Sequence, residues 1–257
     1  MKEDKIPSTI HYCWFGKGKK SKLMCNCMKT WRKYFPDYDI IEWNENNFDI
    51  NCNDYVREAY KSKKYAFVSD YARLYVLYNY GGIYFDTDIE VVKRFDNIIT
   101  NRDIYGFEKK DLIMTGVMIA RKKSEIIKQF LEIYDSLKFL NDNGTYNMIP
   151  NTCRLTEILK ANGLVCNGER QILENNIAEV YPVEFFCAYD MYNSHFIPNE
   201  NTFTIHHYDG SWTSRKEQTS KKIKRLISKI LGVKAYDKIR KIKKGVKNED
   251  SNNNYKL

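Results

Sequence analysis

The stretch from residue 55 to residue 92 constrains the fold of this chain more than any other part of the sequence. An apolar segment with helical periodicity, Tyr55–Tyr80, runs into Gly81 and Gly82, and a strand-like segment, Ile83–Val92, follows. Tandem glycines commonly end helices because glycine enters the left-handed conformation without steric penalty. The order predicts a long helix that stops sharply and connects to a buried strand, which is typical of an α/β sheet.

The N-terminal part of the chain shows the same alternation of strand and helix patterns. Ile6–Phe15 has a strand pattern, Ser21–Tyr34 a helical one, and Tyr38–Trp43 alternates as a strand does. A strand, a helix and a second strand in this order predict a parallel α/β unit. Further along, we expect strands at Ile113–Ala120, Glu179–Phe186 and Thr202–His207, and helices at Ser124–Phe139 and Thr152–Asn162.

Hydrophobic residues make up 43% of the 257 residues, which is enough for a sizeable core and argues against global disorder. The seven cysteines are odd in number and form no C-x-x-C pair, so neither a disulfide framework nor a zinc ribbon is indicated. The N-terminal residues lack the apolar stretch of a signal peptide, and no run approaches the roughly 18 apolar residues of a membrane span. We therefore expect a cytoplasmic protein.

The net charge of +9 is concentrated near the C-terminus. Residues 215–247 contain fourteen Lys and Arg against two acidic residues, so the rest of the chain has a small negative balance. We expect a body at residues 1–214, a basic amphipathic helical arm at 215–247 and a disordered tail at 248–257. The apolar stripe within 220–231 indicates an interfacial helix, so that residues 220–244 contact an anionic membrane on its inner face. The alternative is a helix packed on the body; nucleic-acid binding is not expected.

Two carboxylates, Asp86 and Asp88, lie in the strand-like run GGIYFDTDIEV. On an extended chain, residues i and i+2 point the same way, so both can face one hard cation such as Mn²⁺ or Mg²⁺. The pattern D-x-D is common on surfaces and weak by itself. Its place after an apolar strand strengthens it, because ligands of α/β sheets bind at the carboxyl ends of strands.

Three other segments contain residue types suited to a ligand. Asp70 and Arg73 share one helical face, either as a surface ion pair or as a polar pair for sugar hydroxyls and phosphate. Trp14 ends the first strand, either as a core residue or as a platform for a nucleotide base. After the last predicted strand comes HHYDGSW, whose metal-ligating or phosphate-binding candidates are His207, Asp209, Ser211 and Trp212. Adjacent histidines on a strand point opposite ways, so only one of the two readily faces a site.

The segments IPSTIHYCWFGKG, YAFVSDYARLYVLYNYGGIYFDTDIEVVKRFDN and HHYDGSW resemble, in this order, the signatures of glycosyltransferase family 32, whose sugar-binding region contains a DXD motif. Capsule transferases and initiating mannosyltransferases belong to this family, and the glucosyltransferase domain of clostridial toxins is a distant relative. The resemblance implies a GT-A nucleotide-sugar-binding fold with a central mixed sheet flanked by helices, to which the basic arm is appended.

The resemblance also implies roles for individual residues. Trp14 would stack on the donor base, and Asp70 and Arg73 would hold the donor sugar. Asp86 would contact the donor or the metal, and Asp88 would bind the metal, which makes Asp86, Asp88 and Arg73 the catalytic set. In the last motif, Ser211 and Trp212 would close over the diphosphate, and Asp209, His207 or Ser211 would complete the metal site.

By the same resemblance, the chain would be a metal-dependent retaining hexosyltransferase that uses a nucleotide-sugar, with a UDP-sugar favoured. Its acceptor would be a glycan, such as a lipid-linked saccharide in capsule or cell-surface polysaccharide synthesis. Toxin-like glycosylation of a protein is an alternative, as is a non-catalytic basic adaptor on a membrane. The acceptor side departs from the family pattern, because Met148–Thr152 stands where many relatives carry a Gly-Pro pair.

Overall fold

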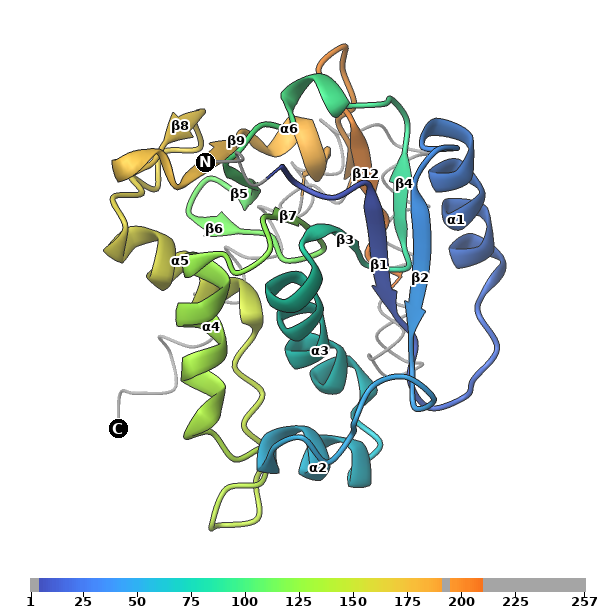
Figure 1. The fold of residues 1–257 in the computed structure, drawn as a ribbon, viewed down its shortest axis with the longest axis vertical. Coiled ribbons are helices and arrows are strands. Elements are labelled where there is room, and N and C mark those ends of the chain that lie inside the picture. Colours follow the sequence, from blue (N-terminus) through green and yellow to red (C-terminus); the bar gives the residue numbers. More distant parts are fainter. Residues whose placement is uncertain (1–4, 191–194, 210–257) are drawn as a thin grey trace, which may run out of the picture.

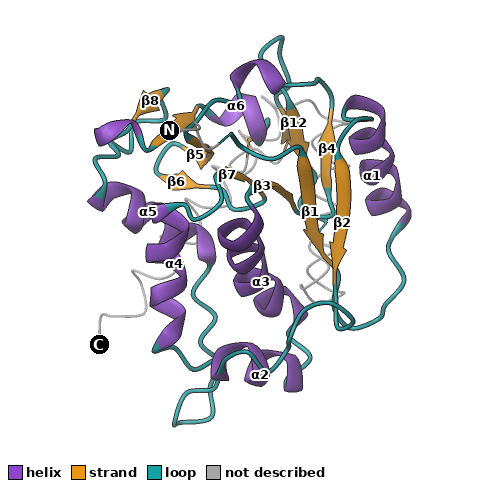
Figure 2. Cartoon of the chain, viewed as in Figure 1, coloured by secondary structure: helices purple, strands orange, loops and turns teal. Residues whose placement is uncertain are grey.

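A computed structural model describes residues 5–190 and 195–209 as one α/β body around a central mixed sheet (Figures 1 and 2). The main path of the sheet runs in the order β2-β1-β3-β7-β5-β9-β8, and β6 pairs with β5. These strands are β1 Thr9–Cys13, β2 Asp39–Trp43, β3 Gly82–Phe85, β5 Asp103–Lys109, β6 Leu112–Ile113, β7 Val117–Ala120, β8 Gln171–Ile172 and β9 Ala178–Tyr181. Two small pairs accompany the sheet, β4 Ile89–Val91 with β12 Thr204–His206 and β10 Tyr189–Asp190 with β11 His195–Phe196.

The helices cover both faces of this sheet (Figure 1). Their bounds are α1 Lys22–Tyr34, α2 Asp54–Lys61, α3 Tyr65–Tyr80, α4 Glu125–Asp135, α5 Asn151–Ala161 and α6 Val183–Phe186, with short 3-10 turns at Asp96–Ile98 and Glu174–Asn176. Side-chain caps fix several starts: Ser21 accepts a hydrogen bond from the Met24 amide, and Ser124 accepts one from the Ile127 amide.

The predicted parallel unit is confirmed, because β1 pairs in parallel with both β2 and β3. On the other side of β3, strand β7 runs antiparallel, with Phe85 opposite Val117. The sheet is therefore mixed and flanked by helices, as predicted. The carboxyl ends of β1 and β3 lie at one edge, beside the amino end of β7.

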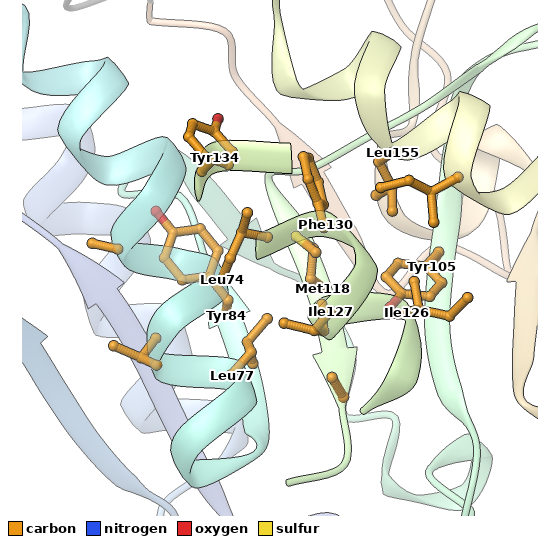
Figure 3. Packing of buried hydrophobic residues seen from close by; sticks show 14 of the residues in the cluster. Leu74, Leu77, Tyr84, Tyr105, Met118, Ile126, Ile127, Phe130, Tyr134 and Leu155 are labelled. Carbon is orange, nitrogen blue, oxygen red and sulfur yellow. The ribbon is translucent and has the colours of Figure 1, made fainter. Parts of the chain in front are cut away.

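Apolar side chains fill the space on both faces of the sheet. On one face, α3, α4 and α5 pack on the central strands, and Figure 3 shows Leu74, Met118 and Phe130 from three different elements in this layer. On the other face, Trp31 and Phe35 of α1 pack with Phe85 and Phe95. The Trp31 indole also donates to the Ile89 carbonyl oxygen at 2.7 Å, which attaches α1 to β4.

The single helix predicted at Tyr55–Tyr80 is wrong, because the structure has two, α2 and α3. Lys63 adopts a positive φ of 56°, which breaks the helical path between them. The predicted end of the second helix is confirmed: Gly81 and Gly82 have φ values of 69° and 108°, and β3 begins at Gly82. Here the glycines are needed for space as well, since a Cβ on Gly82 would lie 2.6 Å from the Thr9 carbonyl oxygen.

Two predicted strands are interrupted in the structure. Ile83–Val92 divides into β3 and β4 around a turn, and Ile113–Ala120 divides into β6 and β7. The region predicted as a strand at Glu179–Phe186 contains the end of β9 and then the helix α6, which starts after Pro182. Strand β5 was not predicted at all, although all but the last of its seven residues are buried.

Among the described residues, no helix is long and apolar enough to cross a membrane. The basic arm at 215–247, the tail at 248–257, and the predicted ligand residues Ser211 and Trp212 lie outside the described residues.

Candidate active site

The turn that carries Asp86 and Asp88 lies at the carboxyl end of β3. The Asp86 amide donates to the Gly116 carbonyl oxygen at 2.8 Å, and the Ile89 amide donates to the Asp86 carbonyl oxygen at 3.0 Å. The two residues therefore belong to a tight turn and not to the extended strand that the sequence suggested. Both carboxylates nevertheless belong to one group of possible metal ligands, as the sequence predicted.

Arg73 of α3 joins two carboxylates beside this turn. Its guanidinium lies 3.0 Å from an Asp70 carboxylate oxygen and 3.2 Å from Asp86 Oδ1, and the residue is only 5% exposed. It also donates to the carbonyl oxygens of Ser69 and Thr115. The predicted polar pair of Asp70 and Arg73 is thus a buried network, because most guanidinium N–H groups already have a protein partner.

Electrostatics of this network follow from burial and pairing. Burial raises the pKa of Asp70 to about 6, although the charge of Arg73 opposes the shift. Burial likewise lowers the pKa of Arg73, but the nearby Asp86 and Asp70 outweigh it and raise the pKa overall. Tyr84 extends the network because its hydroxyl donates to Asp86 Oδ1 at 3.0 Å. One Asp86 oxygen, Oδ1, is therefore held by both Arg73 and Tyr84.

The second Asp86 oxygen faces Gly116 and His206. A Cβ on Gly116 would lie 3.1 Å from both Asp86 Oδ2 and His206 Cε1, so a larger residue here would push these side chains apart. Potential ligand atoms of Asp86, Asp88 and His206 all lie within 4.8 Å of one another. His206 Nδ1 is buried and has no hydrogen-bond partner within the described part of the chain. Two carboxylates and an imidazole with an unpartnered ring nitrogen are suitable ligands for a divalent cation.

His206 reaches this group because β12 pairs antiparallel with β4, which places His206 opposite Ile89. Its Nε2 lies 3.3 Å from Asp88 Oδ1, and the two side chains are 12% and 13% exposed. Burial opposes ionisation of Asp88, but the charge and hydrogen bond of His206 and the Asp209 amide outweigh it and lower the pKa to about 2. Burial would lower the pKa of His206, yet Asp88 raises it overall. Each residue of the pair therefore favours the charged form of the other.

The two residues predicted as rivals for the third ligand lie outside this group. His207 points the other way from His206, and its Nε2 lies 2.7 Å from Glu90 Oε2. Asp209 contributes its backbone amide, which donates to Asp88 Oδ2 at 2.8 Å, while its carboxylate lies 3.4 Å from the Ser21 hydroxyl. The alternation of adjacent histidines was foreseen, but the sequence does not show which of the two faces the carboxylates.

Tyr208 and Glu108 are further site residues that the sequence did not single out. The Tyr208 ring stacks on the His206 ring with centroids 3.8 Å apart, and its hydroxyl donates to Glu108 Oε1 at 2.9 Å. Tyr208 has a positive φ of 48°, an uncommon conformation for a bulky residue, which marks a constrained turn. Burial raises the pKa of Glu108. Glu108 lies on the unpredicted strand β5, so no periodic signal was available to find it.

Trp14 lies at the same sheet edge, directly after β1. It is half-buried and belongs to neither apolar core, which argues against the core interpretation. Its indole N–H donates to the Gly18 carbonyl oxygen at 2.7 Å, and the Lys20 ammonium lies 5.4 Å from its ring centroid. The structure therefore leaves part of an aromatic ring accessible at the edge where Asp86 and Asp88 lie.

Comparison with known proteins identifies the type of this site. Residues 21–105 match the family described as "Glycosyltransferase sugar-binding region containing DXD motif". The matched region includes Asp70, Arg73, Asp86 and Asp88, and ends before His206. No curated protein matches the chain.

Three solved structures resemble the fold. "PaToxG Glycosyltransferase" is 22% identical with a TM-score of 0.48, and the similarity covers 61% of this chain and 70% of that chain. A glycosyltransferase involved in the glycosylation of the major capsid of PBCV-1 is 14% identical with a TM-score of 0.45, over 82% of this chain and 98% of that one. A mutant transferase is 11% identical with a TM-score of 0.37, over 60% and 84% of the two chains.

The matched DXD region holds the predicted acidic and basic residues, and the structure assembles them at one edge of the sheet. The chain is a glycosyltransferase.

Proposed function

We propose that this glycosyltransferase is a metal-dependent retaining enzyme that transfers a hexose from a UDP-sugar to a glycan acceptor. The observation that supports the proposal is that two groups of side chains share one residue, Asp86. Asp70, Arg73 and Asp86 form a buried network, and Asp86 also belongs to the group of Asp88 and His206. A sugar-binding network and a cation-binding group that share one carboxylate are suited to a sugar diphosphate.

The candidate metal ligands are Asp86, Asp88 and His206, and Mn²⁺ fits this mixture of oxygen and nitrogen donors. When bound, the cation supplies positive charge that stabilises the diphosphate as it leaves. Because the segment HHYDGSW resembles the last signature of the family, we propose Ser211 as a further ligand and Trp212 as a cover for the diphosphate.

The protein's own residues orient the donor. In this proposal, Trp14 stacks on the base, and Asp70 accepts a hydrogen bond from a sugar hydroxyl. Arg73 has a different role from the one expected for a phosphate-binding arginine, since its guanidinium is engaged by Asp70, Asp86 and two carbonyl oxygens. It holds both carboxylates in place and so positions the donor indirectly.

We propose front-face substitution for the transfer itself. The bond between the anomeric carbon and the diphosphate oxygen breaks while the acceptor hydroxyl oxygen attacks from the same side, and the departing phosphate oxygen takes the hydroxyl proton. This route needs no enzymic base beside the acceptor. A glycosyl-enzyme adduct trapped on any carboxylate would contradict it.

For the acceptor we propose a lipid-linked saccharide used in capsule or cell-surface polysaccharide synthesis, reached from the cytoplasmic face of the membrane. The support is the resemblance to capsule transferases and the basic, amphipathic composition of residues 220–244. A lipid-linked acceptor is confined to a membrane surface, and a basic segment would concentrate the enzyme there.

The test is a panel of nucleotide-sugars incubated with the protein and Mn²⁺, with release of free sugar and nucleotide as the readout. Asp88→Asn removes one charged ligand without changing side-chain volume, and we expect donor hydrolysis to fall about 10²–10³-fold. The matched control is Asp111→Asn, because Asp111 is an exposed aspartate on a turn and lies outside the candidate ligand group. An unchanged rate in Asp88→Asn, or full activity in excess chelator, would contradict the proposal.

A further inference from the structure

Glu108, on β5, is a buried acidic residue beside the candidate metal group. The residue is 8% exposed, and its Oε2 has no hydrogen-bond partner among the residues that the structure describes. A buried carboxyl group with an unpartnered oxygen costs free energy, so stability alone gives no reason for a glutamate at this position. After burial, the charge of His206 has the largest influence on the pKa of Glu108 and lowers it, which shows that the two side chains lie close together.

Glu108 lies at a β-bulge in the pairing of β5 with β6. Phe107 lies opposite Ile113, and two residues further along β5, Lys109 lies opposite Leu112. Two steps on β5 thus correspond to a single step on β6, and Glu108 is the extra residue. Bulges of this kind redirect a side chain and are frequent next to active sites. The regular pairing is therefore interrupted at the one residue of β5 whose carboxyl group contacts Tyr208.

Tyr208 connects this carboxyl group to His206. Its hydroxyl donates to Glu108 Oε1 at 2.9 Å, and its ring stacks on the His206 ring with centroids 3.8 Å apart and planes 23° apart. A ring stacked this closely limits how far the imidazole can rotate or shift. The position of His206 therefore depends on the position of the Tyr208 ring.

The backbone of Tyr208 shows that this ring is held in place by its contacts. Its φ of 48° is uncommon for a bulky residue and costs free energy, so it persists only where the surroundings hold it. The contacts available are the hydrogen bond to Glu108, Cys187 Sγ at 3.1 Å from the hydroxyl, and the Tyr189 ring with its centroid at 5.1 Å. Of these, the hydrogen bond to the carboxyl group is the strongest directional contact.

Glu108 does not itself belong to the candidate ligand group. Potential ligand atoms of Asp86, Asp88 and His206 lie within 4.8 Å of one another, and Glu108 lies outside this set. Any effect of Glu108 on a cation is therefore exerted through the ligands. Residues that orient a metal ligand in this way commonly change metal affinity when they are replaced.

We propose that Glu108 is a positioning residue of the metal site. Through the Tyr208 hydroxyl it fixes the aromatic ring on which His206 stacks, and so it holds His206 at the distance from Asp86 and Asp88 that a shared cation requires. The inference rests on the metal dependence in the proposed function and adds a residue outside the ligand group.

The test is the affinity of the full chain for Mn²⁺ alone, measured by calorimetry without donor. Glu108→Leu removes the acceptor of the Tyr208 hydroxyl and fills a similar volume, and we expect the affinity to fall about 10–100-fold. Its midpoint in urea is expected to stay close to that of the unaltered protein, because an apolar side chain is at no disadvantage in a buried position. Glu108→Gln keeps a carbonyl oxygen for the hydroxyl and should retain affinity within about threefold.

A second variant tests the connection through Tyr208. Tyr208→Phe keeps the stacked ring and removes the hydroxyl, so we expect a loss of Mn²⁺ affinity similar to that in Glu108→Leu. The two changes remove the same hydrogen bond, and the double variant should lose little more than either single variant. Tyr38→Phe is the matched control, because its hydroxyl donates to Asp96 Oδ1 at 3.0 Å outside the candidate ligand group, and it should bind Mn²⁺ like the unaltered protein.

Unchanged Mn²⁺ affinity in Glu108→Leu or in Tyr208→Phe would overturn the inference. Additive losses in the double variant would also overturn it, as would a loss in Glu108→Gln as large as that in Glu108→Leu, because the effect would then arise from charge and not from the contact with Tyr208. Donor hydrolysis separates the two proposals. A Mn²⁺-dependent enzyme whose variants bind Mn²⁺ normally refutes the role of Glu108 alone, whereas an unaltered protein that binds no Mn²⁺ refutes the proposed metal dependence and this inference with it.

Discussion

The Arg73 network and the loop between α4 and α5 are built in different ways. In the network, Arg73 is almost fully buried and joins Asp70 and Asp86. The loop between α4 and α5, in contrast, exposes side chains such as Met148 and Ile149, which are 45% and 53% exposed. The side chains of the network therefore hold one another in place, whereas the apolar side chains of the loop remain in contact with solvent.

A second comparison, between Arg73 and Arg94, shows how burial changes the effect of an arginine on its carboxylate partners. Arg94 also joins two carboxylates, Asp37 and Asp96, but its side chain is 39% exposed against 6% for Arg73. The two arginines have the same kind of partners and different access to water. Water compensates the exposed carboxylates when their arginine is removed, and it reaches the buried ones poorly.

The largest expected effect follows from this difference. Arg73→Gln leaves Asp70 and Asp86 without their cation, and we expect the free energy of unfolding to fall by about 3–5 kcal/mol. Arg94→Gln, the matched control, should change it by no more than about 1 kcal/mol. Urea denaturation of the three proteins measures both values. Similar losses in the two variants would mean that burial does not distinguish the two networks.

The next effect concerns the two hydrogen bonds that Asn151, the first residue of α5, makes with α3 and α4. Asn151→Ala removes the acceptor of the Tyr134 hydroxyl and the donor to the Asp70 carbonyl oxygen. Since Tyr134 is buried, we expect a loss of about 1–3 kcal/mol in the free energy of unfolding. Asn143→Ala, at an exposed position of the loop before α5, is the control and should change it by less than about 0.5 kcal/mol. A small loss in Asn151→Ala would show that water replaces both bonds.

A smaller effect tests how closely the metal group is packed. Gly116→Ala introduces a methyl group 3.1 Å from Asp86 Oδ2 and from His206 Cε1, so these side chains must shift by a few tenths of an ångström. We expect the affinity for Mn²⁺, measured by calorimetry on the donor-free protein, to fall about tenfold, because metal ligands tolerate little displacement. Gly18→Ala is the control, since its methyl group would contact only Trp14 at 3.9 Å. Equal affinities would indicate that the ligand group adapts freely.

The sequence predicts the candidate site where the information is local. Asp70 and Arg73 are three residues apart on one helix, and the glycines that follow the helix fix where β3 begins, so the local sequence is enough to predict both features. His206 depends on the register of β12 against β4, a pairing between segments more than a hundred residues apart. Neighbouring His207 offers the same chemistry, so residue type cannot separate the two.

The errors in the predicted fold arise where a turn interrupts an element. The run Ile83–Val92 is divided by a turn that the hydrogen bond from the Ile89 amide to the Asp86 carbonyl oxygen closes, and the apolar residues on either side do not reveal it. The break between α2 and α3 lies at Lys63, whose left-handed conformation lysine rarely adopts. Strand β5 has a different cause: its buried residues include the charged Asp103 and Glu108, so burial does not follow polarity there.

The smallest expected effect concerns the loop between α4 and α5. Met148→Ser with Ile149→Ser replaces two large apolar side chains that are 45% and 53% exposed, so unfolding exposes little additional surface from them. We expect the free energy of unfolding to change by less than about 0.5 kcal/mol in urea denaturation. Ile133→Ser, on α4 and partly buried against the core, is the contrasting control and should lower it by more than about 1 kcal/mol, as large-to-small core changes do. A marked loss in the double variant would mean that the loop's apolar side chains support the fold, as the buried Arg73 network does.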